Sequence, residues 1–272
     1  IEGGGRLTGM AVCMHSYQDI ISHENLLEAW KEFVCGKRNK KDVELFQRHL
    51  MSNVISLYDD LISRKYRHSP YEAFSISDPK PRNIHKASVR DRLLHHAIYR
   101  RLYPYFDKQF IHDSYSCRLD KGTHRALIQF KRFANKVSCN HTKTVWILKC
   151  DIRKFFASID QDILLAILRK HIVDDNIFLL LQVIIQSFQS TGIGKGLPLG
   201  NLTSQLLVNI YMNEFDQYVK RVLKAKYYIR YADDFVILSR DRKHLKEILI
   251  HIQKFLAEKL KLQLHPDKVF IE

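Results

Sequence analysis

The chain has 272 residues, with 44 Lys and Arg against 29 Asp and Glu, so its net charge is +15. An apolar share of 46% excludes a wholly disordered chain, and 10 Gly and 6 Pro exclude a collagen-like one. We find no apolar run that could span a bilayer and no CxxC pair among the five Cys, and we expect no signal peptide. These features predict a folded cytoplasmic protein with no membrane contact, and they favour nucleic acid as its partner.

The first half of the chain is predicted to be largely helical. Residues 1–9 are rich in Gly and lack periodicity, so we expect a tail there. Apolar residues at helical spacing predict four helices, over 22–33, 41–65, 89–103 and 122–137. Pro104 is expected to end the third of them. The turn signal Asp78-Pro79-Lys80-Pro81 between two extended runs predicts a hairpin over 71–85.

The second half alternates between strand and helix signals. β-branched and apolar residues predict four strands, over 144–151, 227–231, 235–239 and from 262 to 264. Asp160 and Asp174 are expected to cap helices that run to about residues 171 and 189. A glycine-rich loop follows over 191–200, and the remaining helices are predicted over 201–223 and 241–260. This order predicts an α+β fold with helices on one face of an antiparallel sheet.

The turn Tyr231-Ala232-Asp233-Asp234 places two adjacent acids between two predicted strands. Such acids are costly unless something neutralises them, and Mg²⁺ binds carboxylate oxygens while keeping waters and substrate phosphates. The plainer alternative is an ordinary polar turn, in which Asp is common. Asp151 ends the strand predicted over 144–151, where it would by itself be a strand-end cap. If that strand lies beside the hairpin, the acids can hold two metal ions roughly 3.5–4 Å apart.

Six sequence blocks, taken in order, resemble those of reverse transcriptases over roughly residue 75 to the end. They lie at 80–102, 112–127, 148–160 (motif A), 196–216 (motif B), 228–238 (motif C) and 260–269 (motif D). The resemblance implies a right-hand polymerase, with an N-terminal extension and largely helical fingers over 10–143. It implies a palm over 144–272, which is an antiparallel sheet backed by helices. One block would be a weak indication, but six in register are specific.

The resemblance assigns catalysis and metal binding to the acids Asp151, Asp233 and Asp234. The backbone carbonyl of Ile152 would complete a metal shell, and the implied cofactors are two Mg²⁺ ions, with Mn²⁺ as an alternative. Lys268 matches a motif D lysine that donates a proton to pyrophosphate. Its plainer interpretation is a solvated lysine near a chain end.

The resemblance also assigns residues that bind the incoming deoxynucleoside triphosphate. Lys80 and Arg82 match fingers cations over the triphosphate, and Arg92 either joins them or pairs with the neighbours of Asp91. Phe156 matches a steric gate whose ring excludes a 2′-hydroxyl, although it could be a core aromatic, as is expected of Phe155.

In motif B, Leu199, Gly200 and Gln205 match the loop and helix under the nascent base pair. The loop lacks the GxxxxGK[ST] spacing, so it is not a P-loop. An aliphatic Leu199 before Gly200, followed by Ser204-Gln205, resembles the reverse transcriptases of diversity-generating retroelements.

That subfamily implies error-prone copying of a template RNA at adenines. The implied partners are template RNA, primer or cDNA, deoxynucleoside triphosphates and a small basic accessory protein, in a bacterial or phage-encoded system. Three alternatives remain open. Two are enzymes: a group II intron-like reverse transcriptase or maturase, and a phage-defence relative. The third is an RNA-binding module without activity, against which the intact Asp151, Asp233 and Asp234 argue.

The family continues past motif D into a thumb, whereas this sequence ends at Glu272, soon after Lys268. The sequence therefore predicts a thumb that is absent or truncated. Processive synthesis by this sequence alone is not expected, because the thumb grips the duplex.

Overall fold

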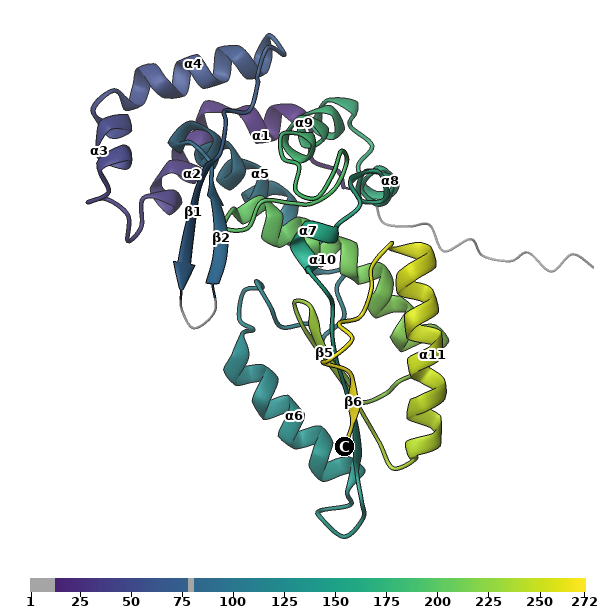
Figure 1. Cartoon of the computed structure of the whole chain (residues 1–272). Helices are drawn as coiled ribbons and strands as arrows, with labels where there is room; N and C mark the ends of the chain where they lie inside the picture. The colour runs from purple at the N-terminus through teal and green to yellow at the C-terminus, as the bar shows by residue number, and fades with distance from the viewer. Residues whose placement is uncertain (1–12, 78–80) are drawn as a thin grey trace, which may run out of the picture.

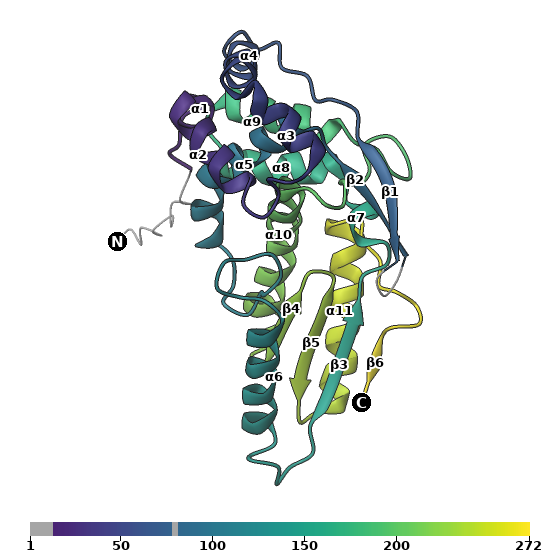
Figure 2. The ribbon, with the colours of Figure 1, turned by 90° about the vertical axis from the view of Figure 1, so that its left-hand side faces the viewer.

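The computed structural model describes residues 13–77 and 81–272. The predicted tail over 1–9 and the central turn of the predicted hairpin lie outside these residues. Helices make up the N-terminal part, and the C-terminal part is built around an antiparallel sheet (Figures 1 and 2). The predicted α+β class is confirmed. None of the described helices is both long and apolar enough to cross a membrane.

Four helices open the described chain: α1 (Tyr17–Ile21), α2 (His23–Phe33), α3 (Lys41–Arg48) and α4 (Leu50–Ile62). The single helix predicted over 41–65 is wrong, because it breaks at His49, where φ is −121° and ψ is 34°. The side-chain amide of Asn53 donates to the carbonyl of Phe46 at 3.0 Å and satisfies an acceptor at the break.

A hairpin and a long helix follow. Strands β1 (Glu72–Ser77) and β2 (Pro81–Lys86) pair antiparallel, as predicted. Helix α5 (Val89–Asp107) does not end before Pro104 but continues through it. Pro104 removes one hydrogen bond from the last turn, and Phe106 beyond it is 1% exposed, so its burial favours the extra turn.

The sheet has the order β4-β5-β3-β6, and all of its neighbouring strands are antiparallel. The strands are β3 (Trp146–Asp151), β4 (Tyr228–Tyr231), β5 (Asp234–Ser239) and β6 (Phe270–Ile271). The strand predicted from 262 to 264 is wrong: Leu262 is buried, and Leu264 makes only an isolated bridge to Ile152. After α11, the chain pairs with β3 only at β6.

Helices cover both faces of the sheet rather than one. The remaining helices are α6 (Thr123–Val137), α7 (Phe155–Ser158), α8 (Gln161–His171), α9 (Asp175–Gln186), α10 (Leu202–Gln217), the π-helical turn η1 (Tyr218–Val222) and α11 (Arg242–Lys259). Asp160 and Asp174 cap α8 and α9 as predicted. Ile229 and Leu238 pack with α6, whereas alternate strand residues such as Phe235 belong to the main core with α10 and α11.

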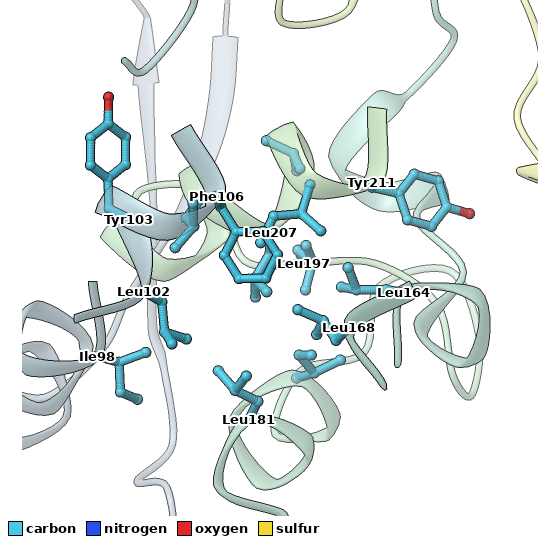
Figure 3. Close-up of a cluster of buried hydrophobic side chains, with 14 of the residues drawn as sticks. Ile98, Leu102, Tyr103, Phe106, Leu164, Leu168, Leu181, Leu197, Leu207 and Tyr211 are labelled. Atoms are coloured by element: carbon cyan, nitrogen blue, oxygen red, sulfur yellow. The ribbon is translucent and has the colours of Figure 1, made fainter. Parts of the chain in front are cut away.

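Helix α10 joins the helical part to the sheet. At its N-terminal half, Leu207 packs among Ile98 and Phe106 of α5, Leu168 of α8 and Leu181 of α9 (Figure 3). At its other end, Phe215 contacts Phe235 of β5, with ring centroids 5.0 Å apart. One buried core therefore fixes the position of the helical N-terminal part relative to the sheet.

Candidate active site

Three acids meet at one end of the sheet. Asp151, the last residue of β3, is the register partner of Asp234, the first residue of β5. The tight turn between β4 and β5 presents Asp233 beside them, and Ala232 in this turn has a left-handed φ of 54°. The backbone N–H of Ile152 donates to the carbonyl of Asp233 at 3.2 Å, which ties the turn to β3.

These carboxylates repel one another. Burial raises the pKa of Asp233, and the negative charges of Asp234 and Asp151 raise it further. The Lys268 ammonium donates to Asp151 Oδ2 at 2.8 Å, and this bond raises the pKa of Lys268. The end of the sheet thus gathers three acids, and Lys268 pairs with Asp151. This concentration of carboxylates favours the binding of further positive charge.

The donor chemistry of this site fits a hard divalent cation. Mg²⁺ takes one or two carboxylates and fills its remaining positions with waters and substrate phosphates. Within residues 13–77 and 81–272, no three His, Cys, Asp or Glu side chains are arranged as a ready metal cage. A cation here would therefore depend on ligands from the substrate as well as on Asp151, Asp233 and Asp234.

A pocket of about 710 Å³ opens between the hairpin and the loop before α10. Phe156 and Leu199 both line it, together with Lys154 at the start of α7. Phe155 points away into the core and is 3% exposed, as predicted. The hairpin is fixed to the loop here, because the His85 N–H donates to the carbonyl of Leu199 at 3.0 Å.

A second pocket, of about 340 Å³, lies on the other side of the motif B loop. Arg92, Gly200 and Gln205 line it with Lys86 and His95. A Cβ on Gly200, whose φ is 106°, would lie 2.8 Å from Ile84 Cγ2, so only glycine lets the loop approach the hairpin this closely.

Cationic side chains line this second pocket beside apolar ones such as Phe33 and Ile84. Arg92 and Lys86 both pair with Asp42, at 2.5 and 2.8 Å. Burial lowers the pKa of His95 to about 3, and within the described chain neither of its ring nitrogens has a hydrogen-bond partner. The side-chain oxygen of Asn201 is likewise buried without a partner among the described residues. The pocket therefore offers cations to a ligand, whereas the unpartnered atoms of His95 and Asn201 are buried in its wall.

Residues 77–272 match the family model described as reverse transcriptase (RNA-dependent DNA polymerase). The chain belongs to the reverse transcriptase family. The predicted family is confirmed, and with it the predicted enzyme class of the family, a nucleotidyltransferase that acts as an RNA-directed DNA polymerase. Reverse transcriptases generally use divalent metal ions, in keeping with the donor set at Asp151 and Asp233.

Two curated proteins are similar along most of the chain. Protein YkfC of Escherichia coli is 27% identical over 268 residues, which cover 84% of this chain and 69% of that protein. The COX1/OXI3 intron 2 protein of Saccharomyces cerevisiae is 21% identical over 289 residues. That match covers 82% of this chain but only 33% of the yeast protein.

A solved structure confirms the fold. Apo telomerase from Candida tropicalis, truncated from its C-terminal domain, matches with a TM-score of 0.53 and 12% identity. The match covers 82% of this chain and 55% of that one. The palm fold of reverse transcriptases, an antiparallel sheet backed by helices, is thus the fold of β3 to β6 and their helices.

The structure distributes the residues predicted for this reverse transcriptase over three places. Asp151, Asp233, Asp234 and Lys268 gather at the end of the sheet, beside the backbone of Ile152. Phe156 and Leu199 share the larger pocket, whereas Arg92, Gly200 and Gln205 share the smaller one. Arg82 lies exposed on β2, and Lys80 lies outside the described residues. Arg92 therefore lines a different pocket from the predicted steric gate.

Sequence reasoning missed two residues that connect these places. His85 bonds to the Leu199 carbonyl, and the Asn201 side-chain amide donates to the carbonyl of His85 at 2.8 Å. Their only signal was position, since His85 ends the predicted hairpin and Asn201 follows Gly200. Nothing in the sequence indicates that the segments around His85 and Asn201, which are 116 residues apart, contact each other.

Proposed function

We propose that this chain copies RNA into DNA by two-metal nucleotidyl transfer at the end of its sheet. The observation that carries the proposal is the register pair of Asp151 and Asp234, with Asp233 in the adjoining turn. Two bound Mg²⁺ ions would supply activation of the primer 3′-hydroxyl and stabilisation of the developing charge at phosphorus. Asp151, Asp233 and Asp234 would hold these ions, together with the backbone carbonyl of Ile152.

The neighbouring side chains serve the substrate. Lys268, beside Asp151, is placed to protonate the pyrophosphate that leaves. Phe156 closes the larger pocket against a ribose 2′-hydroxyl, with Arg82 over the triphosphate. The smaller pocket, with Arg92 and Gln205, receives the template strand, since its cations suit phosphates.

Primer extension tests this function directly. An RNA template with an annealed DNA primer, all four deoxynucleotides and Mg²⁺ should give extended primer, and chelation of the metal should stop the reaction. Binding of the duplex without extension, in either Mg²⁺ or Mn²⁺, would refute the polymerase and favour an RNA-binding module.

Binding of template RNA is expected to depend steeply on salt. The chain has a net charge of +15, and contacts to about six phosphates give a slope of about −4 in log affinity against log salt. Affinity should then fall about 300-fold between 50 and 200 mM salt, as measured by fluorescence anisotropy. Lys86→Gln in the smaller pocket should flatten the slope, whereas Lys254→Gln on the solvent side of α11 should not. Salt-independent binding would contradict the phosphate contacts.

We propose further that the enzyme belongs to a diversity-generating retroelement in a bacterial or phage system. Leu199 before Gly200 supports this, because an aliphatic side chain removes a polar contact that would monitor the nascent pair. A small basic accessory protein is then a partner. An intron-associated reverse transcriptase is the second candidate, favoured by the similarity to the yeast intron 2 protein.

Leu199→Gln is expected to lower misincorporation opposite adenine, by about 2- to 13-fold, because a hydrogen bond contributes about 0.5–1.5 kcal/mol of discrimination. Leu199→Met, which stays apolar and similar in size, is the matched control and should leave the error spectrum unchanged. Sequencing of products copied from one adenine-rich RNA by all three proteins measures the effect. Equal adenine error rates would refute the fidelity role, and faithful copying by the wild type with its accessory partner would refute the subfamily.

A further inference from the structure

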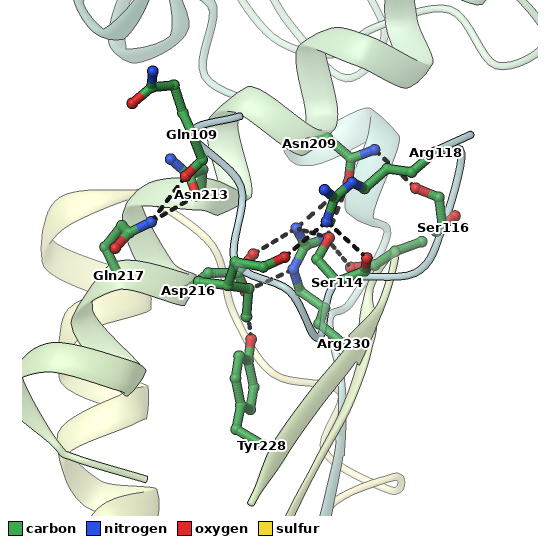
Figure 4. Close-up of polar contacts among 12 residues, drawn as sticks. Gln109, Ser114, Ser116, Arg118, Asn209, Asn213, Asp216, Gln217, Tyr228 and Arg230 are labelled. Atoms are coloured by element: carbon green, nitrogen blue, oxygen red, sulfur yellow. Dashed lines mark hydrogen bonds and ion pairs between the residues drawn. The ribbon is translucent and has the colours of Figure 1, made fainter. Parts of the chain in front are cut away.

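A fully buried arginine lies two residues before the turn that carries Asp233. Arg230 on β4 is 1% exposed, and its carboxylate partner, Asp216 of α10, is 0% exposed. The guanidinium is bidentate, with Nε 2.8 Å from Oδ1 and Nη2 2.7 Å from Oδ2 of Asp216 (Figure 4). Burial alone would lower the pKa of Arg230, but the charge of Asp216 raises it, so the arginine remains charged. Such a pair is tolerated only when its hydrogen bonds are well made.

The same guanidinium contacts the catalytic turn. Nη1 of Arg230 donates to the backbone carbonyl of Ala232 at 3.0 Å. Ala232 has a left-handed φ of 54°, a conformation that costs a residue with a side chain about 1–2 kcal/mol. Because the peptide is planar, anchoring this carbonyl also orients the backbone N of Asp233.

Arg230 also connects the turn to two other parts of the protein. Asn209 of α10 accepts from both Nη1 and Nη2 at 3.4 Å, and its amide donates to the carbonyl of Ser116 at 2.9 Å. Ser114 accepts from Nη2 at 3.2 Å, and the backbone N–H of Arg230 donates to the carbonyl of Asp113 at 3.0 Å. Arg230 is therefore the buried hydrogen-bond donor that connects the turn, α10 and the 113–116 loop.

We propose that Arg230 is a positioning residue that, anchored on Asp216, holds the Asp233 carboxylate where it binds metal. The inference rests on the proposed two-metal function of Asp233. A merely structural ion pair would stabilise the fold without affecting the metal. Removing the hydrogen bond to Ala232, by contrast, would let the turn relax and would weaken metal binding at Asp233.

Arg230→Lys tests this proposal, because lysine keeps the charge but its single ammonium cannot span both Asp216 and the Ala232 carbonyl. Tyr228→Phe is the matched control. The Tyr228 hydroxyl donates to the same Asp216 carboxylate at 2.7 Å from the same buried strand, but among the described residues it makes no hydrogen bond to the turn. Thermal unfolding of both variants measures the loss of stability that they share.

Two readouts separate positioning from stability. In primer extension we expect Arg230→Lys to lower kcat about 10- to 100-fold and to raise the half-saturating Mg²⁺ concentration, with duplex affinity unchanged. In a complex stalled by a dideoxy-terminated primer and the next deoxynucleotide, electron paramagnetic resonance should show Mn²⁺ binding weakened at least about tenfold. Tyr228→Phe should keep the wild-type Mg²⁺ and Mn²⁺ dependence.

If Arg230→Lys does not fold, Asp216→Asn replaces it, since this isosteric change weakens the anchor and should shift Mn²⁺ affinity in the same direction. Wild-type Mn²⁺ affinity in the folded variant would overturn the positioning role and leave a structural pair. A wild-type protein that binds duplex but does not extend it would instead refute the proposed function itself.

Discussion

Asp151→Asn or Asp233→Asn is expected to lower the rate of primer extension by at least about 1,000-fold while the protein stays folded. Each change removes a charge that holds metal at the reacting phosphorus, and a loss of about 4 kcal/mol in transition-state stabilisation corresponds to that factor. Single-nucleotide extension in Mg²⁺ measures the rate. Asp267→Asn, an acid near the site whose side chain is 86% exposed, is the matched control and should remain active.

Asp233→Asn should lower the extension rate but raise the stability of the folded protein. Burial, with Asp234 and Asp151 nearby, raises its pKa in the folded protein above the unfolded value. The stabilising contribution of this group is therefore fully present below its ordinary pKa and is lost as pH rises through the raised value. At neutral pH without metal, Asp233→Asn should raise the melting temperature, and this gain should shrink on acidification.

Asp151→Asn should not share that gain, because Asp151 is paired with the Lys268 ammonium. Melting curves of both variants at several pH values without metal distinguish the two acids. Near-native extension by either variant would contradict the two-metal assignment, and a lower melting temperature of Asp233→Asn at neutral pH would contradict the repulsion at the end of the sheet.

The cluster of acids could be predicted from sequence because it depends on local rules. Strand 144–151 ends on an acid, the hairpin 227–239 presents two more, and antiparallel pairing brings such ends together. The contacts of Arg92 could not be predicted, since its partner Asp42 lies fifty residues earlier on α3. The buried donor Arg230 was also missed, because a strand arginine is usually exposed and only α10 supplies its anchor.

Phe156 tests a different property of the site, the choice of sugar. Its ring lines the larger pocket, half-buried against the core, beside Leu199. If it excludes the 2′-hydroxyl, Phe156→Ala should raise the ratio of ribonucleotide to deoxyribonucleotide incorporation by about 10- to 200-fold, the range that one added group against a pocket wall can supply. The ratio of kcat/KM for the two nucleotides on one template measures this effect.

The adjacent aromatic residue provides the control for this prediction. Phe155 is buried on the core side of α7, with its ring centroid 5.6 Å from that of Phe156, and it does not line the pocket. Phe155→Leu should lower the melting temperature through lost packing, yet leave the sugar ratio unchanged. If Phe156→Ala lowers stability in the same way and also leaves the ratio unchanged, Phe156 is a packing residue and the gate lies elsewhere. A raised ratio in Phe156→Ala alone would assign sugar selection to the ring that faces the pocket.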